Sequence, residues 1–448
     1  MNEVLPYKKE TLLYLLLLIT GVAYYFLCYH TRRDNFLQVF GLFTLLFTSY
    51  YFLNKSFASH FKQLVIAGIL FRVIILFSIP NLSDDVYRFI WDGRLLANGI
   101  NPYNHLPTEV IQLPPIPGIT KGLYQQLNSP SYYTIYPPVL QSIFWLTAKV
   151  FPTNIFGAIV CMKTIILFAE TGTVLLLPLV LKRLPLPAHL SLLYALNPLV
   201  VAELTGNVHF DAVMIFFMIS AFLLLLQNKI YLSAIFLGLS ISSKLIPILF
   251  IPLVIKKLGW GYGLIYSFIS GFVTIALFAF IVDKTTIFHF LASINLFLSH
   301  FEFNASLYYI VRWIGALVTG YNIIAFAGPL LSVTGAVIIF IISFRDKEIS
   351  NTKFLTKALF ILTVYYLFAT TVHPWYICMP VIISACTAYR YAITWSYVAT
   401  LSYFAYHSNP VKENLWLVGA EYLIVIGYAC WELKINKQPV NESAVKKY

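Results

Sequence analysis

Long apolar stretches dominate the chain and recur with short polar breaks between them. Segments of about 17 to 25 mostly apolar residues match the hydrocarbon thickness of a bilayer. Such segments lie near residues 11–29, 35–53, 62–80, 155–181, 188–204, 210–227, 230–256, 262–282, 321–344, 353–372, 376–393 and 415–433. The pattern predicts an all-α, polytopic bundle of about 11 to 14 transmembrane helices.

Three other stretches, 136–152, 245–256 and 394–407, are apolar without forming a regular span. Two of them contain proline residues, which remove a backbone donor and favour broken or re-entrant helices. These prolines are Pro137, Pro138, Pro247 and Pro252. We find no linker or low-complexity tract, so residues 1–448 are expected to form one membrane domain.

Composition and charge support a membrane protein. Hydrophobic residues make up 59% of the chain and charged residues only 11%, which excludes an ordinary water-soluble surface. The net charge of +12 does not indicate nucleic-acid binding, because the basic residues form short clusters between apolar runs. Most clusters can be placed in the cytoplasm by the positive-inside rule, and Arg32-Arg33 is the exception. The run from Thr11 to Cys28 lacks a cleavage site and is expected to be a retained first span.

The largest polar excursion is the segment 81–134, which follows the third predicted span. Hydropathy falls there, and Pro and Asn become frequent. Three spans starting in the cytoplasm bring the chain to the outer face, so this segment is predicted to be an extracytoplasmic loop with interfacial helices. The run SDDVYRFIWDGRLLANGINPY, residues 83–103, begins it with the acidic pair Asp84 and Asp85 and ends in helix breakers.

This run and five later elements resemble the GT-C superfamily of membrane glycosyltransferases, in particular its bacterial mannosyltransferase-like branch that uses polyprenyl-phosphate sugars. The later elements, in family order, are YPP at 136–138, NPLVVAELTGNVHFDA at 197–212, SSKLIPILFIP at 242–252, FNASLYYIVR at 303–312 and HPWY at 373–376. The resemblance implies a GT-C fold, a catalytic aspartate in the first large outer loop, a lipid-phosphate-linked donor and inversion at the anomeric carbon.

The chemistry of such a donor agrees with the acidic pair. Polyprenyl phosphate is a good leaving group, so no general acid is obligatory, whereas the acceptor hydroxyl needs a base. Asp85 begins the D-V-Y step shared with related branches and is the expected base. Asp84 is expected to orient Asp85 or to raise its pKa by like-charge repulsion.

The leaving phosphate requires positive charge near the outer surface. Lys244 is the foremost candidate, because it is a lone cation among apolar residues, although snorkelling from a helix end is the alternative. Arg312 is a further candidate. Arg88 and Arg94 either bind substrate or pair with Asp92 or Asp84 and brace the loop, and both interpretations remain open.

A second polar focus is expected around His209 and Asp211, together with Glu203 and Asn207. His373 and Trp375 stand where another span emerges, and Trp375 either stacks on a sugar or anchors at the interface. For both histidines an ordinary interfacial imidazole is the alternative. The expected substrate-binding residues are Arg88, Asp92, Arg94, Tyr136, His209, Asp211, Lys244, Arg312, His373 and Trp375.

No metal and no cofactor are expected. HExxH, HxxxH and cysteine clusters are absent from the sequence, as are a Gly-rich nucleotide loop and a D-x-D step beside the acidic pair. A donor that is already dissolved in the membrane needs no divalent ion to neutralise a pyrophosphate.

The sequence therefore favours an inverting hexosyltransferase of EC class 2.4, with mannose the most common family sugar. It would act on a polyprenyl-phosphate sugar and a glycan or glycolipid acceptor, at the periplasmic face of a bacterial inner membrane. A lipid-linked oligosaccharide polymerase or ligase and a flippase-type transporter are the alternatives. The acidic pair at the outer end of a span argues against the transporter, whose polar residues should lie near the midplane.

Overall fold

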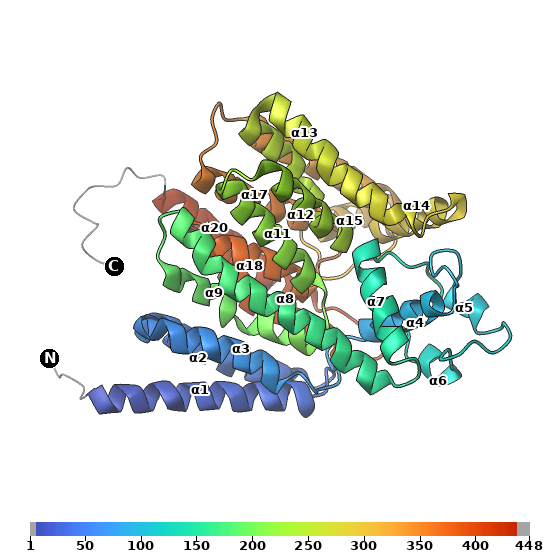
Figure 1. Ribbon diagram of the computed structural model, residues 1–448, viewed down its shortest axis with the longest axis horizontal. Coiled ribbons are helices and arrows are strands. Elements are labelled where there is room, and N and C mark those ends of the chain that lie inside the picture. Colours follow the sequence, from blue (N-terminus) through green and yellow to red (C-terminus); the bar gives the residue numbers. More distant parts are fainter. Residues whose placement is uncertain (1–5, 437–448) are drawn as a thin grey trace.

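The computed structural model describes residues 6–436, and within this range every regular element is a helix (Figure 1). The only β-type pairing in that range is a single bridge between Phe303 and Thr371. The all-α class expected from the hydropathy pattern is therefore confirmed.

The N-terminal half begins with three helices, α1 (Pro6–Tyr29), α2 (Phe36–Ser56) and α3 (Phe61–Ile74). The outer segment follows, with α4 (Asp85–Ala97), α5 (Pro107–Val110), α6 (Lys121–Tyr124) and then α7 (Pro138–Val150). The long helix α8 (Ile155–Arg183) crosses the bundle. It is followed by α9 (Leu192–Ala195), α10 (Pro198–Val200), a π-helix at Val201–Gly206, α11 (Asp211–Leu226) and α12 (Ile230–Ser243).

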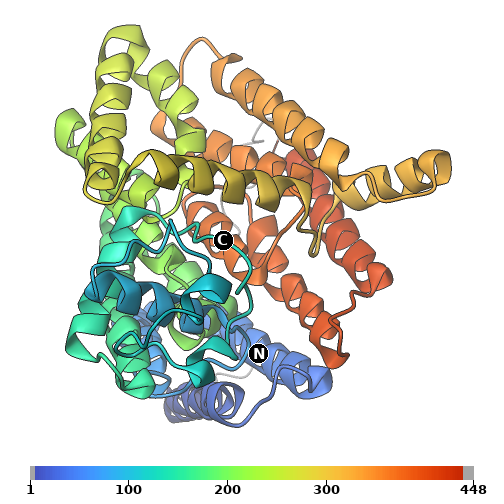
Figure 2. The ribbon, with the colours of Figure 1, turned by 90° about the vertical axis from the view of Figure 1, so that its right-hand side faces the viewer.

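The C-terminal half contains α13 (Ile251–Ala279), α14 (Lys284–Ser299), α15 (Leu307–Thr319), α16 (Ile324–Phe344) and α17 (Asn351–Phe368). It ends with α18 (Cys378–Ala385), α19 (Tyr391–Val398), a 3₁₀ segment at Ala399–His407 and α20 (Leu415–Ile435). In Figure 1, α4, α5, α6 and α14 lie at one end of the bundle, and the start of α1 and the end of α20 lie at the other. Figure 2 views the molecule from the α4–α6 end.

Among the described helices, six are long and apolar enough to cross a membrane, and a seventh span is obtained if one bent pair is counted. This is fewer than the 11 to 14 spans expected. The difference arises because several expected spans are divided into shorter pieces. The expected span 188–204, for example, is two pieces bent by 50°, and the expected span 230–256 is interrupted after α12. The chain remains an integral membrane protein.

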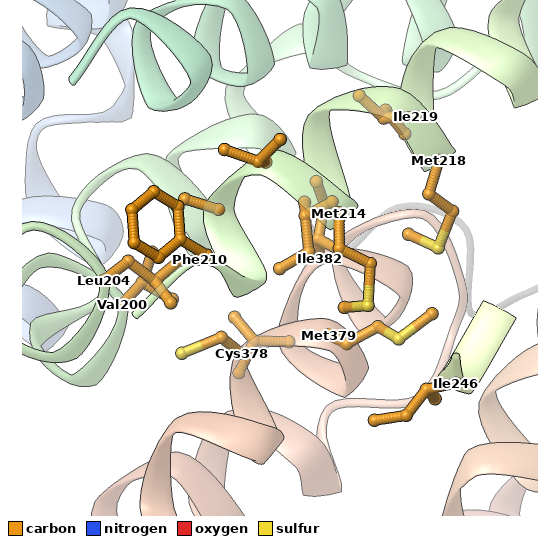
Figure 3. Packing of buried hydrophobic residues seen from close by; sticks show 14 of the residues in the cluster. Val200, Leu204, Phe210, Met214, Met218, Ile219, Ile246, Cys378, Met379 and Ile382 are labelled. Atoms are coloured by element: carbon orange, nitrogen blue, oxygen red, sulfur yellow. The ribbon is translucent and has the colours of Figure 1, made fainter. Parts of the chain in front are cut away.

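Two kinds of apolar surface distinguish the core from the outside. Buried side chains of α11, α18 and the π-helix region pack into one large cluster in the centre of the bundle (Figure 3). Many large apolar side chains on other helices are exposed, such as Leu37, Phe268, Phe280 and Trp416, each at 73% or more. A continuous apolar exterior of this kind requires lipid as its solvent.

Close packing fixes the start of the outer segment. Helix α4 crosses α7 at Gly93, where a Cβ atom would come within 2.2 Å of the Phe144 carbonyl oxygen. Phe89 of α4 stacks on Phe144 at 4.8 Å between ring centroids, and Phe210 contacts both rings. Aromatic pairs of this kind hold α4 against α7 and against the N-terminal end of α11. The first turn of α4, with its acidic residues, is thereby held at the edge of the bundle.

Candidate active site

The acidic pair lies at the start of α4, and its two carboxylates have different partners. Asp84 forms an ion pair with Arg33 at 2.6 Å. Asp85 accepts a hydrogen bond from the Asn128 side chain at 2.7 Å, and its backbone N–H donates to Ser83 Oγ. The Asp85 side chain is 22% exposed. Asp84 is thus paired with a cation, whereas the side-chain donor to Asp85 in the described part of the chain is a neutral amide.

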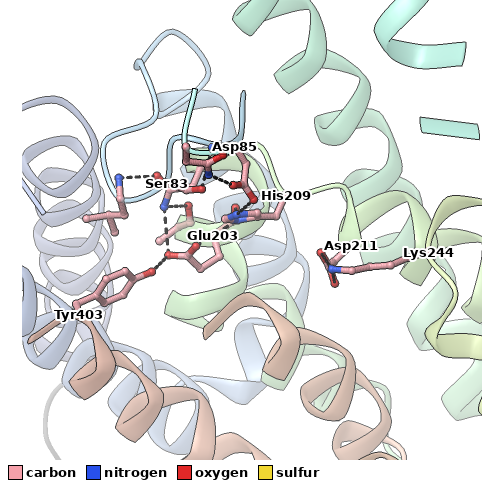
Figure 4. Close-up of polar contacts among 11 residues, drawn as sticks. Ser83, Asp85, Glu203, His209, Asp211, Lys244 and Tyr403 are labelled. Carbon is pink, nitrogen blue, oxygen red and sulfur yellow. Dashed lines mark hydrogen bonds and ion pairs between the residues drawn. The ribbon is translucent and has the colours of Figure 1, made fainter. Parts of the chain in front are cut away.

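His209 faces Asp85 from a different segment (Figure 4). Its Nε2 atom is 4.0 Å from Asp85 Oδ2, and its Nδ1 atom is 3.0 Å from the Glu203 carbonyl oxygen. The preceding residue, Val208, has φ = 63°, which is strained for a β-branched side chain. The π-helix before it is another local irregularity that proteins often place at functional sites. The imidazole therefore follows a segment whose backbone departs twice from regular structure, as is common at functional sites.

A stack of rings supports this imidazole. Trp375 stacks on His209 at 3.8 Å and on His373 at 4.4 Å, and His373 stacks on Phe303 at 4.9 Å. Both faces of the Trp375 ring are covered, so the geometry supports a role in holding the two histidines rather than in stacking on a sugar. Burial lowers the pKa of His373 to about 3, and the positive charge of Lys244 contributes. His373 is consequently neutral at physiological pH.

Lys244 and Asp211 form a separate pair that connects to the ring stack through Tyr376, whose ring is edge-on to Trp375 (Figure 4). Helix α12 ends at Lys244 in an extended conformation, because Pro247 in the following 3₁₀ turn prevents the helix from continuing. The Lys244 Nζ donates to both carboxylate oxygens of Asp211, at 2.8 and 2.7 Å, and lies 4.5 Å from the centroid of the Tyr376 ring. The side chain is 27% exposed. Lys244 is thus held at a helix break by a carboxylate and an aromatic face while remaining accessible.

Four other expected site residues surround the base of the loop. Arg88 is buried and donates to Asp92 at 2.8 Å and to two backbone carbonyls of the loop. Arg94 is also buried and donates to the Gly118 carbonyl. Tyr136 lies close to the acidic residues: burial raises the pKa of Tyr136, and the charges of Asp85 and Asp92 raise it further. Of the two interpretations for Arg88 and Arg94, the contacts support loop bracing.

Arg312 has separate partners. It donates to Glu302 at 2.5 Å and stacks over the Tyr309 ring, on α15. Tyr308 also donates to Glu302. Among the described residues, the ion pair and the ring contact of Arg312 involve none of the Asp85, His209 or Lys244 side chains, so its assignment to substrate remains a prediction without support from the geometry.

Three residues near Asp84 and Asp85 were not among the expected site residues. Arg33 pairs with Asp84 and stacks over Tyr406, Asn128 donates to Asp85, and Tyr403 donates to Glu203. The sequence did contain one signal, since Arg32-Arg33 departs from the positive-inside rule. An arginine retained on the outer side is a candidate partner for an acidic site. Nothing in the sequence pairs Asn128 or Tyr403 with their partners.

The cluster combines three kinds of group that glycosyl transfer requires. Asp85 is an accessible carboxylate, which can accept a proton from an approaching hydroxyl. Lys244 is an accessible cation, which can stabilise a leaving anion. His209 is a buried imidazole whose Nε2 has no hydrogen-bond partner among the described residues. Such an unsatisfied atom beside an accessible carboxylate indicates a place for a ligand.

Comparison with known proteins gives one match. The family described as Alpha-(1->6)-mannopyranosyltransferase, N-terminal domain, matches residues 17–258, more than half of the chain. No curated protein matches. The matched range contains Asp85, His209, Asp211 and Lys244, whereas the residues that complete the cluster from the C-terminal half, such as Trp375, lie outside it.

Proposed function

Because the chain belongs to the alpha-(1->6)-mannopyranosyltransferase family and is a membrane glycosyltransferase, we propose that it moves a mannosyl group from a polyprenyl-phosphate donor to an acceptor glycan or glycolipid. The acceptor atom is a hexose C6 hydroxyl, as an alpha-(1->6) linkage requires. Because the family is one of glycosyltransferases, an enzyme is favoured over the transporter alternative.

The observation that carries the mechanism is the contrast within the acidic pair. Asp84 is paired with the cation Arg33, whereas Asp85 accepts a hydrogen bond from the neutral Asn128 amide and faces His209 Nε2 at 4.0 Å. Asp85 therefore acts as the general base. The acceptor oxygen attacks the anomeric carbon, Asp85 takes the hydroxyl proton, and the bond to the phosphate oxygen breaks with its electron pair. Polyprenyl phosphate leaves, and the anomeric configuration is inverted.

Lys244 is the residue proposed to face the leaving phosphate. It is a partly exposed cation, and a phosphate can share it with Asp211, which already fixes its position. The surrounding low-dielectric protein strengthens such an interaction relative to water. Because the donor is dissolved in the membrane and lacks a pyrophosphate, the reaction is proposed to proceed without a metal.

The test uses the purified full-length protein in lipid nanodiscs with a mannose-terminated oligosaccharide as acceptor. Synthetic polyprenyl-phosphate mannose should be consumed without any nucleotide sugar, and the product should contain an alpha-(1->6) linkage by NMR. Consumption of a nucleotide-activated mannose alone would contradict the proposed donor. Transfer of a whole preassembled glycan, instead of one mannose, would favour the polymerase or ligase alternative.

The active site is proposed to face away from the cytoplasm, in the periplasm of a bacterial inner membrane. Gln112 is exposed in the outer segment, and Glu348 is exposed in the loop between α16 and α17 at the opposite end of the bundle. In a Cys430→Ser background, Gln112→Cys should react with an impermeant maleimide in intact spheroplasts, and Glu348→Cys only after lysis. The reverse labelling pattern would contradict this orientation. Asn104 is less suitable for labelling, because it hydrogen-bonds to Asp283.

A further inference from the structure

Glu203 is a buried carboxylate in the π-helix that the mechanism above does not use. It has no exposed surface, and neither Lys nor Arg contacts it among the described residues. Tyr403 and Asn207 both donate to its Oε1 atom. Its Oε2 atom lies 3.2 Å from His209 Nδ1. Burying a carboxylate without a permanent cation is costly, so its position calls for an explanation.

The contacts of Glu203 connect it to the acidic pair. Asn207, which donates to Glu203, also accepts a hydrogen bond from the Leu82 backbone N–H at 3.1 Å. Leu82 lies just before the acidic pair. Tyr403 comes from the 3₁₀ segment Ala399–His407, far along the chain. Glu203 is thus the point where the outer loop, the π-helix and a C-terminal segment meet (Figure 4).

The surroundings of His209 determine which ring nitrogen carries hydrogen. Nδ1 is hydrogen-bonded to the Glu203 carbonyl oxygen at 3.0 Å, so Nδ1 bears a proton. Glu203 Oε2, which has no hydrogen-bond partner among the described residues, lies 3.2 Å from the same nitrogen and places the carboxylate charge beside the ring. Nε2 is then left facing Asp85 at 4.0 Å with no hydrogen-bond partner among the described residues. Trp375, stacked on the ring, prevents the imidazole from tilting away.

We propose that Glu203 is a positioning residue that acts through His209 on Asp85, an inference that rests on the proposed function. Glu203 fixes the tautomer and the direction of the imidazole, so that the Nε2 lone pair faces the carboxylate that deprotonates the acceptor. After transfer, the proton on Asp85 moves to Nε2, which restores the Asp85 carboxylate. The charge of Glu203 stabilises the resulting imidazolium until it loses the proton to water.

The experiment measures donor KM and kcat of the full-length enzyme for Glu203→Gln, His209→Asn and the double variant. Glu203→Gln should lower kcat roughly 10- to 100-fold, part of the usual contribution of general base catalysis, and change donor KM less than about 2-fold. The double variant should be no slower than His209→Asn alone, because Glu203 acts only through that imidazole.

Glu421→Gln is the matched control, because Glu421 is another fully buried carboxylate, hydrogen-bonded to Asn304 and Trp395. Its kcat should stay near that of the wild type. If Glu203→Gln folds poorly, Tyr403→Phe removes one donor to Glu203 and should give a smaller loss in kcat at constant KM. Additive losses in the double variant, or equal losses for Glu203→Gln and Glu421→Gln, would overturn the inference. An inactive wild type would instead contradict the proposed function.

Discussion

Two of the polar networks inside this apolar bundle differ in whether their hydrogen bonds are complete. In the inner network, the fully buried Arg72 donates to Glu170, Gly68 and Ala195, and Tyr194 donates to Glu170. Every side-chain nitrogen and oxygen of these three polar side chains has a partner. In the outer network, His209 Nε2 has none among the described residues, and Asp85 is accessible.

This difference in hydrogen bonding indicates a structural role for the inner network and a functional role for the outer network. Ionisable groups within a membrane are usually functional, yet a fully satisfied group is also compatible with holding helices together. The inner network joins α3, α8 and α9 and leaves no atom free for a ligand. The outer network leaves His209 Nε2 without a hydrogen-bond partner among the described residues, at the proposed active site. Burial and charge alone would not have distinguished the two networks.

Breaking the inner network should give the largest effect, and on stability rather than chemistry. Arg72→Met leaves Glu170 buried without its cation, which should cost about 3–5 kcal/mol of unfolding free energy. Arg72→Met with Glu170→Gln should recover most of this loss, because no lone charge remains. Thermal unfolding and turnover per folded molecule are the measurements. A stable Arg72→Met protein without turnover would place the inner network in the catalytic machinery.

Lys244→Ala tests whether a polar group of the outer network binds the donor. If Lys244 makes a charged hydrogen bond to the donor phosphate, its loss should cost roughly 1.5–3 kcal/mol, which is about 10- to 100-fold in kcat/KM for the donor. The acceptor KM should change little. The control is Lys149→Ala, an exposed lysine of α7 that donates to the Ala97 carbonyl. Unchanged donor dependence in folded Lys244→Ala protein would support snorkelling instead.

Arg33→Gln should give the smallest effect. The Arg33–Asp84 pair is about one third exposed on each side, so its stabilisation should be only about 0.2–1 kcal/mol. Its loss frees a second carboxylate beside Asp85, and turnover should fall a few-fold. Arg32→Gln is the matched control, because Arg32 pairs with Asp34 and is 83% exposed. Equal turnover of the two variants would remove Arg33 from the site.

The features of the fold that depend on hydropathy and on local residue pattern could be predicted from the sequence. The all-α class and the break after α12 follow from apolar runs and proline, whereas the extracytoplasmic side of segment 81–134 stays a prediction. Mannosyl transfer followed from the resemblance and is now supported by family membership. Fewer described helices are long enough to span than the apolar runs suggested, because apolar composition does not reveal where a helix bends or stops short.

The contacts between distant segments could not be predicted. The covering of both faces of Trp375 by His209 and His373 joins segments far apart in the chain, and no local rule indicates it. Tyr403 lies in a stretch whose structure the hydropathy pattern left ambiguous, and there it donates to Glu203. Of these contacts, only that of Arg33 had a signal in the sequence, because Arg32-Arg33 is the basic pair that departs from the positive-inside rule.

The central claim, that Asp85 is the general base of a lipid-phosphate-dependent mannosyltransferase, is tested most directly by comparing purified Asp85→Asn and Asp84→Asn. Turnover of synthetic polyprenyl-phosphate mannose is measured for each, with donor affinity determined separately and EDTA added in parallel. Asp85→Asn should lose at least about 10²-fold in turnover with donor binding retained, Asp84→Asn should be milder, and EDTA should have no effect. An active Asp85→Asn protein, or activity lost with EDTA and restored by Mn²⁺, would contradict this account.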